Sequence, residues 1–151
     1  MSEPVLIKTD DEFGSLIAST KYVVVDFWAE WCPPCKAIGP LFAKLSKDHS
    51  VDNQLTFAKV DIDTTPEVAK KFGIRSIPTF LFFEDGKLQS LDLKDKVSGG
   101  GVVLSEDGKI TQLRGADPRS LTTIAGELGK LAKESLTPAP AAADTQTLAA
   151  A

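Results

Sequence analysis

The sequence has little of what several classes of protein require. Its 151 residues include only two cysteines and one histidine, and two cysteines cannot by themselves build a disulfide-rich scaffold or a four-thiolate metal site. Lys and Arg number 17 against 21 Asp and Glu, a net charge of −4, so no basic excess is present to neutralise the phosphates of a nucleic acid. The longest apolar runs fall far short of the ~20 residues that a membrane-spanning helix needs. We therefore expect neither a nucleic acid nor a membrane as a partner.

The first eleven residues lack the pattern of a targeting segment. They contain Glu3, Asp10 and Asp11, and no basic stretch leads into an apolar core, so they match neither a secretory signal nor an Arg-rich transit peptide. We expect a cytoplasmic protein. Structural disulfides are rare in that reducing compartment, so the two cysteines need another explanation.

What the sequence does contain is an alternation of strand and helix patterns. Strand patterns occupy residues 5–7, 22–28, 55–60 and 79–83. Helix patterns occupy residues 10–19, 32–49, 65–73 and the stretch that follows Asp117-Pro118. The run at 22–28 (YVVVDFW) is almost continuously apolar, which is typical of a strand buried on both faces. The alternation, with a hairpin signal at Asp85-Gly86, predicts an α/β fold.

Two segments do not fit this plan. Residues 88–109 contain the glycine-rich stretch 98–101, and the turn sequence EDGK at 84–87 recurs at 106–109, which indicates that a second hairpin or loop interrupts the first. Residues 137–151 are rich in Ala and Pro and offer no large apolar face, so we predict a disordered tail. The remaining residues, 1–136, are expected to form one domain that includes the insertion.

The segment Trp31-Cys32-Pro33-Pro34-Cys35 stands between a buried strand and a helix. A cysteine at a helix N-terminus meets unpaired N–H groups and the positive end of the helix dipole, which both favour its thiolate. We expect Cys32 to attack a disulfide, and Cys35, one turn further inside the helix and less exposed, to resolve the mixed disulfide. Half of a zinc site, with His49 as the single nitrogen ligand, and an inert pair of core thiols are the weaker alternatives.

Asp26 is the one charged residue in the apolar strand. Burial disfavours the charged form of a carboxyl and should raise its pKa. Behind the helix start, such a group could take the proton from Cys35 and return it on reversal, with Lys59 on the third strand moderating its charge. A strand-end aspartate that only hydrogen-bonds the backbone is the alternative that the residues leave open.

Together these residues resemble the thioredoxin family. The resemblance rests on the segments VDFWAEWC at 25–32, PCK at 34–36, AKVDID at 58–63, FGIRSIPT at 72–79 and GA at 115–116. It covers about residues 5–87 and 110–134. It implies the thioredoxin fold, in which a central mixed sheet of four to five strands is flanked by helices.

The resemblance also implies roles for particular residues. Pro78 would be a cis-proline facing the disulfide, because a tertiary amide tolerates cis and the missing N–H leaves the sulfurs unobstructed. Asp26 and Lys59 match the buried carboxylate and its lysine. The substrate groove would be formed by Trp31, Pro34, Ile62, Ser76, Ile77, Pro78, Gly115 and Ala116.

The function implied by the resemblance is the reduction of protein disulfides. Family members are recharged by thioredoxin reductase with electrons from NADPH, so we expect thioredoxin reductase and disulfide-containing proteins as partners. We expect a monomer with no bound cofactor and no metal. A thioredoxin-fold binding or chaperone-type module is the alternative from another class, and Pro33 leaves open a more oxidising, isomerase-like variant.

The insertion allows two strand registers. If residues 79–83 pair with residues 110–113, the segment 88–109 leaves and returns at the end of the sheet far from the cysteines. If residues 79–83 pair with residues 88–93 instead, the extra segment lies near the substrate groove. We favour the first register, because residues 114–118 then keep the strand, the groove glycine and the helix cap in sequence.

Pro33 stands where the common family motif has glycine, and it generates the first prediction. Replacing Pro33 with Gly should change the redox potential of the cysteine pair without abolishing activity, because glycine restores a backbone N–H at the helix start and frees φ. The equilibrium with glutathione would be measured for both proteins. Indistinguishable potentials would contradict the prediction.

Overall fold

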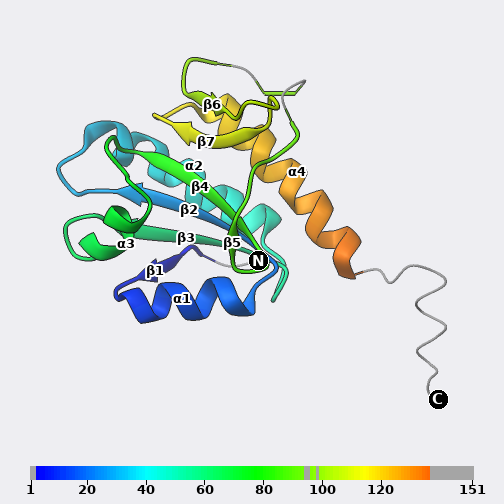
Figure 1. Cartoon of the computed structure of the whole chain (residues 1–151), viewed down its shortest axis with the longest axis horizontal. Coiled ribbons are helices and arrows are strands. Elements are labelled where there is room, and N and C mark those ends of the chain that lie inside the picture. The colour runs from blue at the N-terminus through cyan, green and yellow to red at the C-terminus, as the bar shows by residue number, and fades with distance from the viewer. Residues whose placement is uncertain (1–2, 94–95, 98, 137–151) are drawn as a thin grey trace.

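The computed structural model describes residues 3–93, 96–97 and 99–136. The tail predicted to be disordered, residues 137–151, lies outside the described residues. The elements in chain order are β1 (Val5–Ile7), α1 (Asp10–Ser19), β2 (Tyr22–Trp28), α2 (Pro33–His49), β3 (Leu55–Asp61), α3 (Pro66–Lys71), β4 (Thr79–Glu84), β5 (Lys87–Leu88), β6 (Val102–Leu104), β7 (Ile110–Arg114) and α4 (Pro118–Leu136) (Figure 1).

The strands form one mixed sheet in the order β1-β3-β2-β4-β7-β6, and β5 pairs with β4. β1 and β2 run parallel to β3, while the other pairs are antiparallel. This confirms the α/β class and the mixed sheet. The expected number of four to five strands is wrong, because within the described part of the chain the sheet has seven. The additional strands, β5 and β6, come from the boundary and the interior of the insertion.

Helices cover both faces of the sheet, and β2 shows why. Its alternate residues point to opposite faces: Val23, Val25 and Phe27 join one buried cluster with α1 and α3, and Tyr22 and Val24 join another with α2 and α4. A strand that is buried on both faces needs the nearly continuous apolar run that its sequence has. The strand that leads to the cysteines is thereby enclosed in the core.

Local capping explains where α1 begins. The hydroxyl of Thr9 accepts a hydrogen bond from the Glu12 N–H at 3.0 Å, and the Glu12 carboxylate accepts one from the Lys8 N–H at 2.7 Å. Thr65, the residue that precedes α3, makes no such bond. Its hydroxyl donates instead to the carbonyl of Ile7 at 3.3 Å, which joins the start of α3 to the edge strand β1.

The insertion uses parts of both registers. At the end of the sheet near the cysteines, Phe80 pairs with Leu113, as the favoured register requires, but at the far end Phe83 pairs with Leu88. The place beside β4 is thus shared between β5 and β7. The segment between them leaves and returns at the far end, as expected, yet it does not stay there: β6 runs along β7 and pairs Val102 with Leu113.

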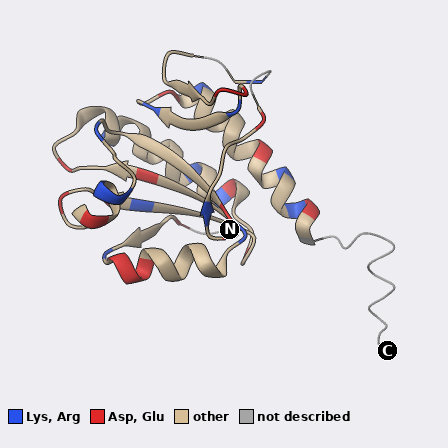
Figure 2. Cartoon of the chain, in the orientation of Figure 1, with Lys and Arg blue, Asp and Glu red and all other residues tan. Residues whose placement is uncertain are grey.

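The inserted segment is packed against the body of the protein. Val97 is 5% exposed and belongs to the core cluster beneath α4. Lys96 forms an ion pair with Glu127 of α4 at 3.1 Å, and Lys130 approaches the same carboxylate at 3.3 Å. Acidic and basic residues are interspersed along α4, where these contacts form (Figure 2). The insertion therefore adds to the hydrophobic core on the α4 side of the sheet.

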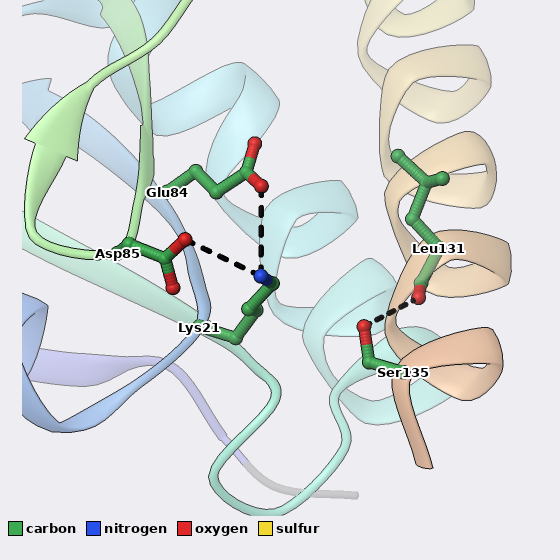
Figure 3. Close-up of polar contacts among 5 residues, drawn as sticks. All are labelled: Lys21, Glu84, Asp85, Leu131 and Ser135. Carbon is green, nitrogen blue, oxygen red and sulfur yellow. Dashed lines mark hydrogen bonds and ion pairs between the residues drawn. The ribbon is translucent and has the colours of Figure 1, made fainter. Parts of the chain in front are cut away.

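Lys21 connects β2 to the turn between β4 and β5 at the end of the sheet opposite the cysteines. Its ammonium lies 3.3 Å from the Asp85 carboxylate and 3.7 Å from that of Glu84, and its carbonyl accepts from the Asp85 N–H at 2.8 Å (Figure 3). Asp85 and Gly86 have φ values of 54° and 82°, which fits the tight turn that the Asp-Gly pair predicts. These contacts hold the beginning of β2 in register with β4.

Burial of Val97 predicts that the insertion contributes to stability. Replacing Val97 with Ala should lower the free energy of unfolding by about 1.5 kcal/mol, since two buried methyl groups are lost. Urea denaturation would measure the change. Leu104 of β6 is 52% exposed, so Leu104→Ala is the control and should cost less than about 0.5 kcal/mol. A Val97→Ala protein as stable as wild type would show that the insertion lies outside the core.

Candidate active site

The two cysteines lie where β2 gives way to α2. Cys32 is the N-cap of the helix, with φ −101° and ψ 104°, and its sulfur accepts a hydrogen bond from the Cys35 N–H at 3.2 Å. The two residues are joined by a disulfide, with their Cα atoms 5.3 Å apart. The strand-to-helix junction thus brings the two sulfurs together at the positive end of the helix dipole.

The prolines determine which N–H groups are available there. Pro33 and Pro34 occupy the first two positions of α2, and neither has a backbone N–H. The first N–H in the helix is that of Cys35, which points to the Cys32 sulfur, and the next, that of Lys36, bonds the Cys32 carbonyl at 3.1 Å. One backbone donor therefore serves the reactive sulfur.

Both cysteines are buried in the disulfide form. Cys32 is 3% exposed and Cys35 2%, so the expected difference in their exposure is absent in this form. Ala29 is buried with them, and Trp28, Ile62 and Ile77 pack around this cluster. The carbonyl oxygen of Ile77 lies 3.8 Å from the Cys32 sulfur.

A backbone contact joins two other predicted site residues. The Ile77–Pro78 peptide bond is cis, as the resemblance implied. The Pro78 carbonyl accepts a hydrogen bond from the Gly115 N–H at 2.7 Å. Gly115 has a φ of 90°, a conformation open to glycine and unfavourable for most other residues. Residues 77–78 and 115 therefore lie together although almost forty positions separate them in sequence.

The rest of the predicted groove residues are mostly exposed. Trp31 is 66% exposed, and its indole N–H donates to the Asp63 carboxylate at 2.8 Å. Sequence reasoning missed Asp63, although it stands next to Ile62 in the segment AKVDID that carries part of the resemblance. The other exposed members of the predicted groove are Pro34, Ser76 and Ala116.

Asp26 lies on the face of β2 that α2 covers, because its side chain alternates with those of Val25 and Phe27. It is fully buried, and neither carboxyl oxygen has a hydrogen-bond partner in the described part of the chain. Burial raises the pKa of Asp26 from 3.8 to about 7, and the charge of Lys59 opposes the rise. The alternative of a strand-end carboxylate bonded to the backbone is therefore excluded within the described residues.

Lys59 is placed by the parallel pairing of β2 with β3. It is the register partner of Asp26. Its ammonium lies 4.2 Å from the centre of the Trp28 ring, a distance at which the cation is attracted to the aromatic face. The strand pairing thus gathers a carboxyl, an ammonium and an indole on the face of the sheet that α2 covers.

Comparison with known proteins agrees with this geometry. The thioredoxin family model matches residues 4–101. A thioredoxin-like protein of Fusarium culmorum is 44% identical over 128 residues, which span 85% of this chain and 93% of that protein. The crystal structure of Malassezia sympodialis thioredoxin (Mala s 13) aligns with a TM-score of 0.64 at 33% identity, over 85% of this chain and 93% of that one. The chain belongs to the thioredoxin family.

One further relative combines two activities in its name. A bifunctional thioredoxin reductase/thioredoxin of Mycobacterium leprae is 45% identical over 75 residues, which span 50% of this chain and 16% of that protein.

Membership of the thioredoxin family, together with the joined cysteines, supports a thiol–disulfide oxidoreductase. In the described residues no three His, Cys, Asp or Glu side chains are grouped to hold a metal, and no helix is long and apolar enough to cross a membrane.

The raised pKa of Asp26 predicts a stability difference that depends on pH. Between pH 3.8 and about 7 the native protein keeps a proton that the unfolded chain has lost, so wild-type stability falls as pH rises through this window. Asp26→Asn removes the titration. The variant should be more stable than wild type at pH 8 by up to about 4 kcal/mol, and the difference should vanish below about pH 4.

Urea denaturation of the oxidised proteins at both pH values would measure this difference. A stability gap of the same size at pH 4 and at pH 8 would contradict the predicted titration and would point to a packing effect of the amide.

Proposed function

We propose that this thioredoxin-family protein reduces disulfide bonds of other proteins. In the reduced state the Cys32 thiolate attacks one sulfur of the substrate disulfide, forming a mixed disulfide and releasing a substrate thiolate. The Cys35 thiolate then attacks the Cys32 sulfur and releases the second substrate thiolate, and both substrate thiolates take up protons from water. Two electrons pass to the substrate, and the Cys32–Cys35 bond forms. The observation that carries the proposal is this bonded pair at the start of α2.

The position of each sulfur supports this division of roles. Cys32 stands at the helix N-cap, where the Cys35 N–H reaches its sulfur at 3.2 Å and the helix dipole stabilises an anion. Cys35 lies within the first turn of the helix. After the first attack its sulfur is one turn away from the mixed disulfide, so the resolving step is intramolecular.

Asp26 has the properties required of a proton acceptor for Cys35. Its carboxyl is buried on the face that α2 covers, and a pKa of about 7 allows it to hold and release a proton near neutral pH. Lys59, its register partner on β3, limits the rise in pKa through its charge. In this proposal Asp26 takes the Cys35 proton before the resolving step. The charge of Lys59 helps to set the pH at which Asp26 titrates.

Protein substrates would bind across the surface around the disulfide. Four of the predicted groove residues are exposed: Trp31, Pro34, Ser76 and Ala116. Of the other four, Ile62, Ile77 and Gly115 are half-buried and Pro78 is buried. Trp31 is held by its bond to Asp63, so it offers a rigid aromatic surface at low entropic cost. These features support contact with an extended segment next to the target disulfide.

The oxidised protein must be reduced again after each cycle. We infer that thioredoxin reductase does this with electrons from NADPH, since the mycobacterial relative joins the two names in one protein. The chain itself then needs no bound cofactor. It would work as a monomer in the cytoplasm.

Two prolines at the start of α2 argue against the alternative of a more oxidising, isomerase-like variant. A strongly oxidising pair needs a well-stabilised thiolate in its reduced form, whereas Pro33 and Pro34 leave the Cys35 N–H as the first backbone donor in α2. This favours a reductase over an oxidising, isomerase-like variant. A binding or chaperone-type module would not need the cysteines at all, and this difference allows a direct test.

Replacement of each cysteine with serine would test the proposed function. Cys32→Ser should abolish NADPH-dependent insulin reduction in the presence of thioredoxin reductase, because no nucleophile remains. Cys35→Ser should accumulate a mixed disulfide with the substrate, detectable by mass spectrometry, because the resolving thiol is missing. If Cys32→Ser keeps the activity of the wild-type protein, the cysteines are not needed and the binding module is favoured. If Cys32→Ser instead traps the adduct with the substrate, the roles of the two cysteines are reversed.

A further inference from the structure

The insertion brings one of its turns to the end of the sheet that carries the cysteines. The carbonyl of Gly101 accepts a hydrogen bond from the Arg114 N–H at 2.7 Å. A Cβ at Gly99 would stand 3.0 Å from the carboxylate of Asp117, and one at Gly101 would overlap the Arg114 carbonyl. The turn at 99–101 thus lies directly against the segment between β7 and α4.

That segment contacts Pro78, the neighbour of Ile77. Arg114 precedes Gly115, whose N–H bonds the carbonyl of Pro78 at 2.7 Å. The neighbouring carbonyl of Ile77 lies 3.8 Å from the Cys32 sulfur. A short series of backbone contacts therefore leads from the insertion to the disulfide, and the favoured register did not predict it.

The turn is held from both sides. On its N-terminal side Val97 is buried under α4, and Lys96 pairs with Glu127. On its C-terminal side β6 continues into the sheet, with Val103 paired to Gln112. Because described residues on both sides of the turn are anchored to the rest of the protein, another protein meets the turn already in place.

The size of a docked protein determines whether it reaches the turn. β6 lies three strands away from β2, the strand that leads to Cys32, a separation of roughly 14 Å at the usual spacing of paired strands. A protein interface of about 800 Å² per partner corresponds to a patch with a radius of roughly 16 Å. A protein centred on Cys32 therefore covers the turn, whereas a small organic disulfide does not extend to it.

We propose that the turn Gly99–Gly101 forms the outer rim of the surface that contacts protein substrates. The proposal rests on the proposed function, the reduction of protein disulfides. Gly99 and Gly100 are exposed and have no side chain, so the backbone of an extended substrate segment can approach the turn closely. The insertion acts in this way on the choice of protein substrates and leaves the chemistry of the cysteines unchanged.

Gly100 offers the sharpest test, because a Cβ there meets no atom within 4 Å. A tryptophan at this position projects from the rim without disturbing the packing. Each protein would be reduced, freed of reductant and mixed with excess disulfide, and the loss of its two thiols followed in time. Gly100→Trp should slow the reaction with insulin about tenfold, since the added ring obstructs docking, and leave the reaction with hydroxyethyl disulfide unchanged.

Two control variants separate obstruction from other effects. Gly100→Ala changes the backbone freedom at the same position without bulk, and should react with both disulfides at the wild-type rate. Glu106→Trp places the same ring on an exposed residue of the turn at 105–108, at the other end of β6 and away from the cysteines. It should also match wild type. Thermal unfolding would verify that each variant keeps the wild-type Tm.

The proposal is overturned if Gly100→Trp reduces insulin at the wild-type rate. It is also overturned if the variant loses as much activity toward hydroxyethyl disulfide, or if Glu106→Trp slows insulin reduction equally. A wild-type protein that reduces hydroxyethyl disulfide and leaves insulin intact would overturn the proposed function itself, and the role of the rim with it.

Discussion

The burial of β2 at the centre of the sheet is the constraint on which the remaining structure depends. β2 pairs along its whole length with β3 on one side, and with β4 over all but its last residue on the other. Helices cover both of its faces. Because the strand is held so firmly, its last residue, Trp28, determines where the chain turns and where α2 begins. The position of Cys32 follows from that junction, and the pairing with β4 brings the segment before Thr79 against the sulfurs.

The same burial affects both the stability of the fold and the pKa of Asp26. A carboxyl without a hydrogen-bond partner in the core lowers the stability of the fold at the pH where it ionises. Its pKa of about 7 is a direct result of this desolvation, and the charge of Lys59 limits the rise. The desolvation that weakens the core thus also brings the pKa of Asp26 near neutral pH, as the proposed mechanism requires of the group that takes the Cys35 proton.

The insertion adds residues to the edge of the sheet and leaves the strand pairs near the cysteines unchanged. The place beside β4 is shared between β5 and β7, so the pairs that support the site, such as Thr79 with Arg114, are kept. Lengthening a surface loop costs little entropy, and here burial of Val97 and the pairing of β6 with β7 offset part of that cost. The described residues of the insertion thereby extend the edge of the sheet by one strand, β6.

Local sequence determined the helices, the strands outside the insertion and the cysteine motif at the start of α2, because periodicity and capping act between residues a few positions apart. The resemblance added the cis bond before Pro78. The path of residues 88–109 could not be predicted in this way, since short apolar segments on both sides of the insertion satisfy the same alternation and compete for one place beside β4. The bond between Trp31 and Asp63, the burial of Val97 and the contact of Gly101 with Arg114 were decided only by tertiary structure. They depend on which distant segments meet, and no local pattern carries that information.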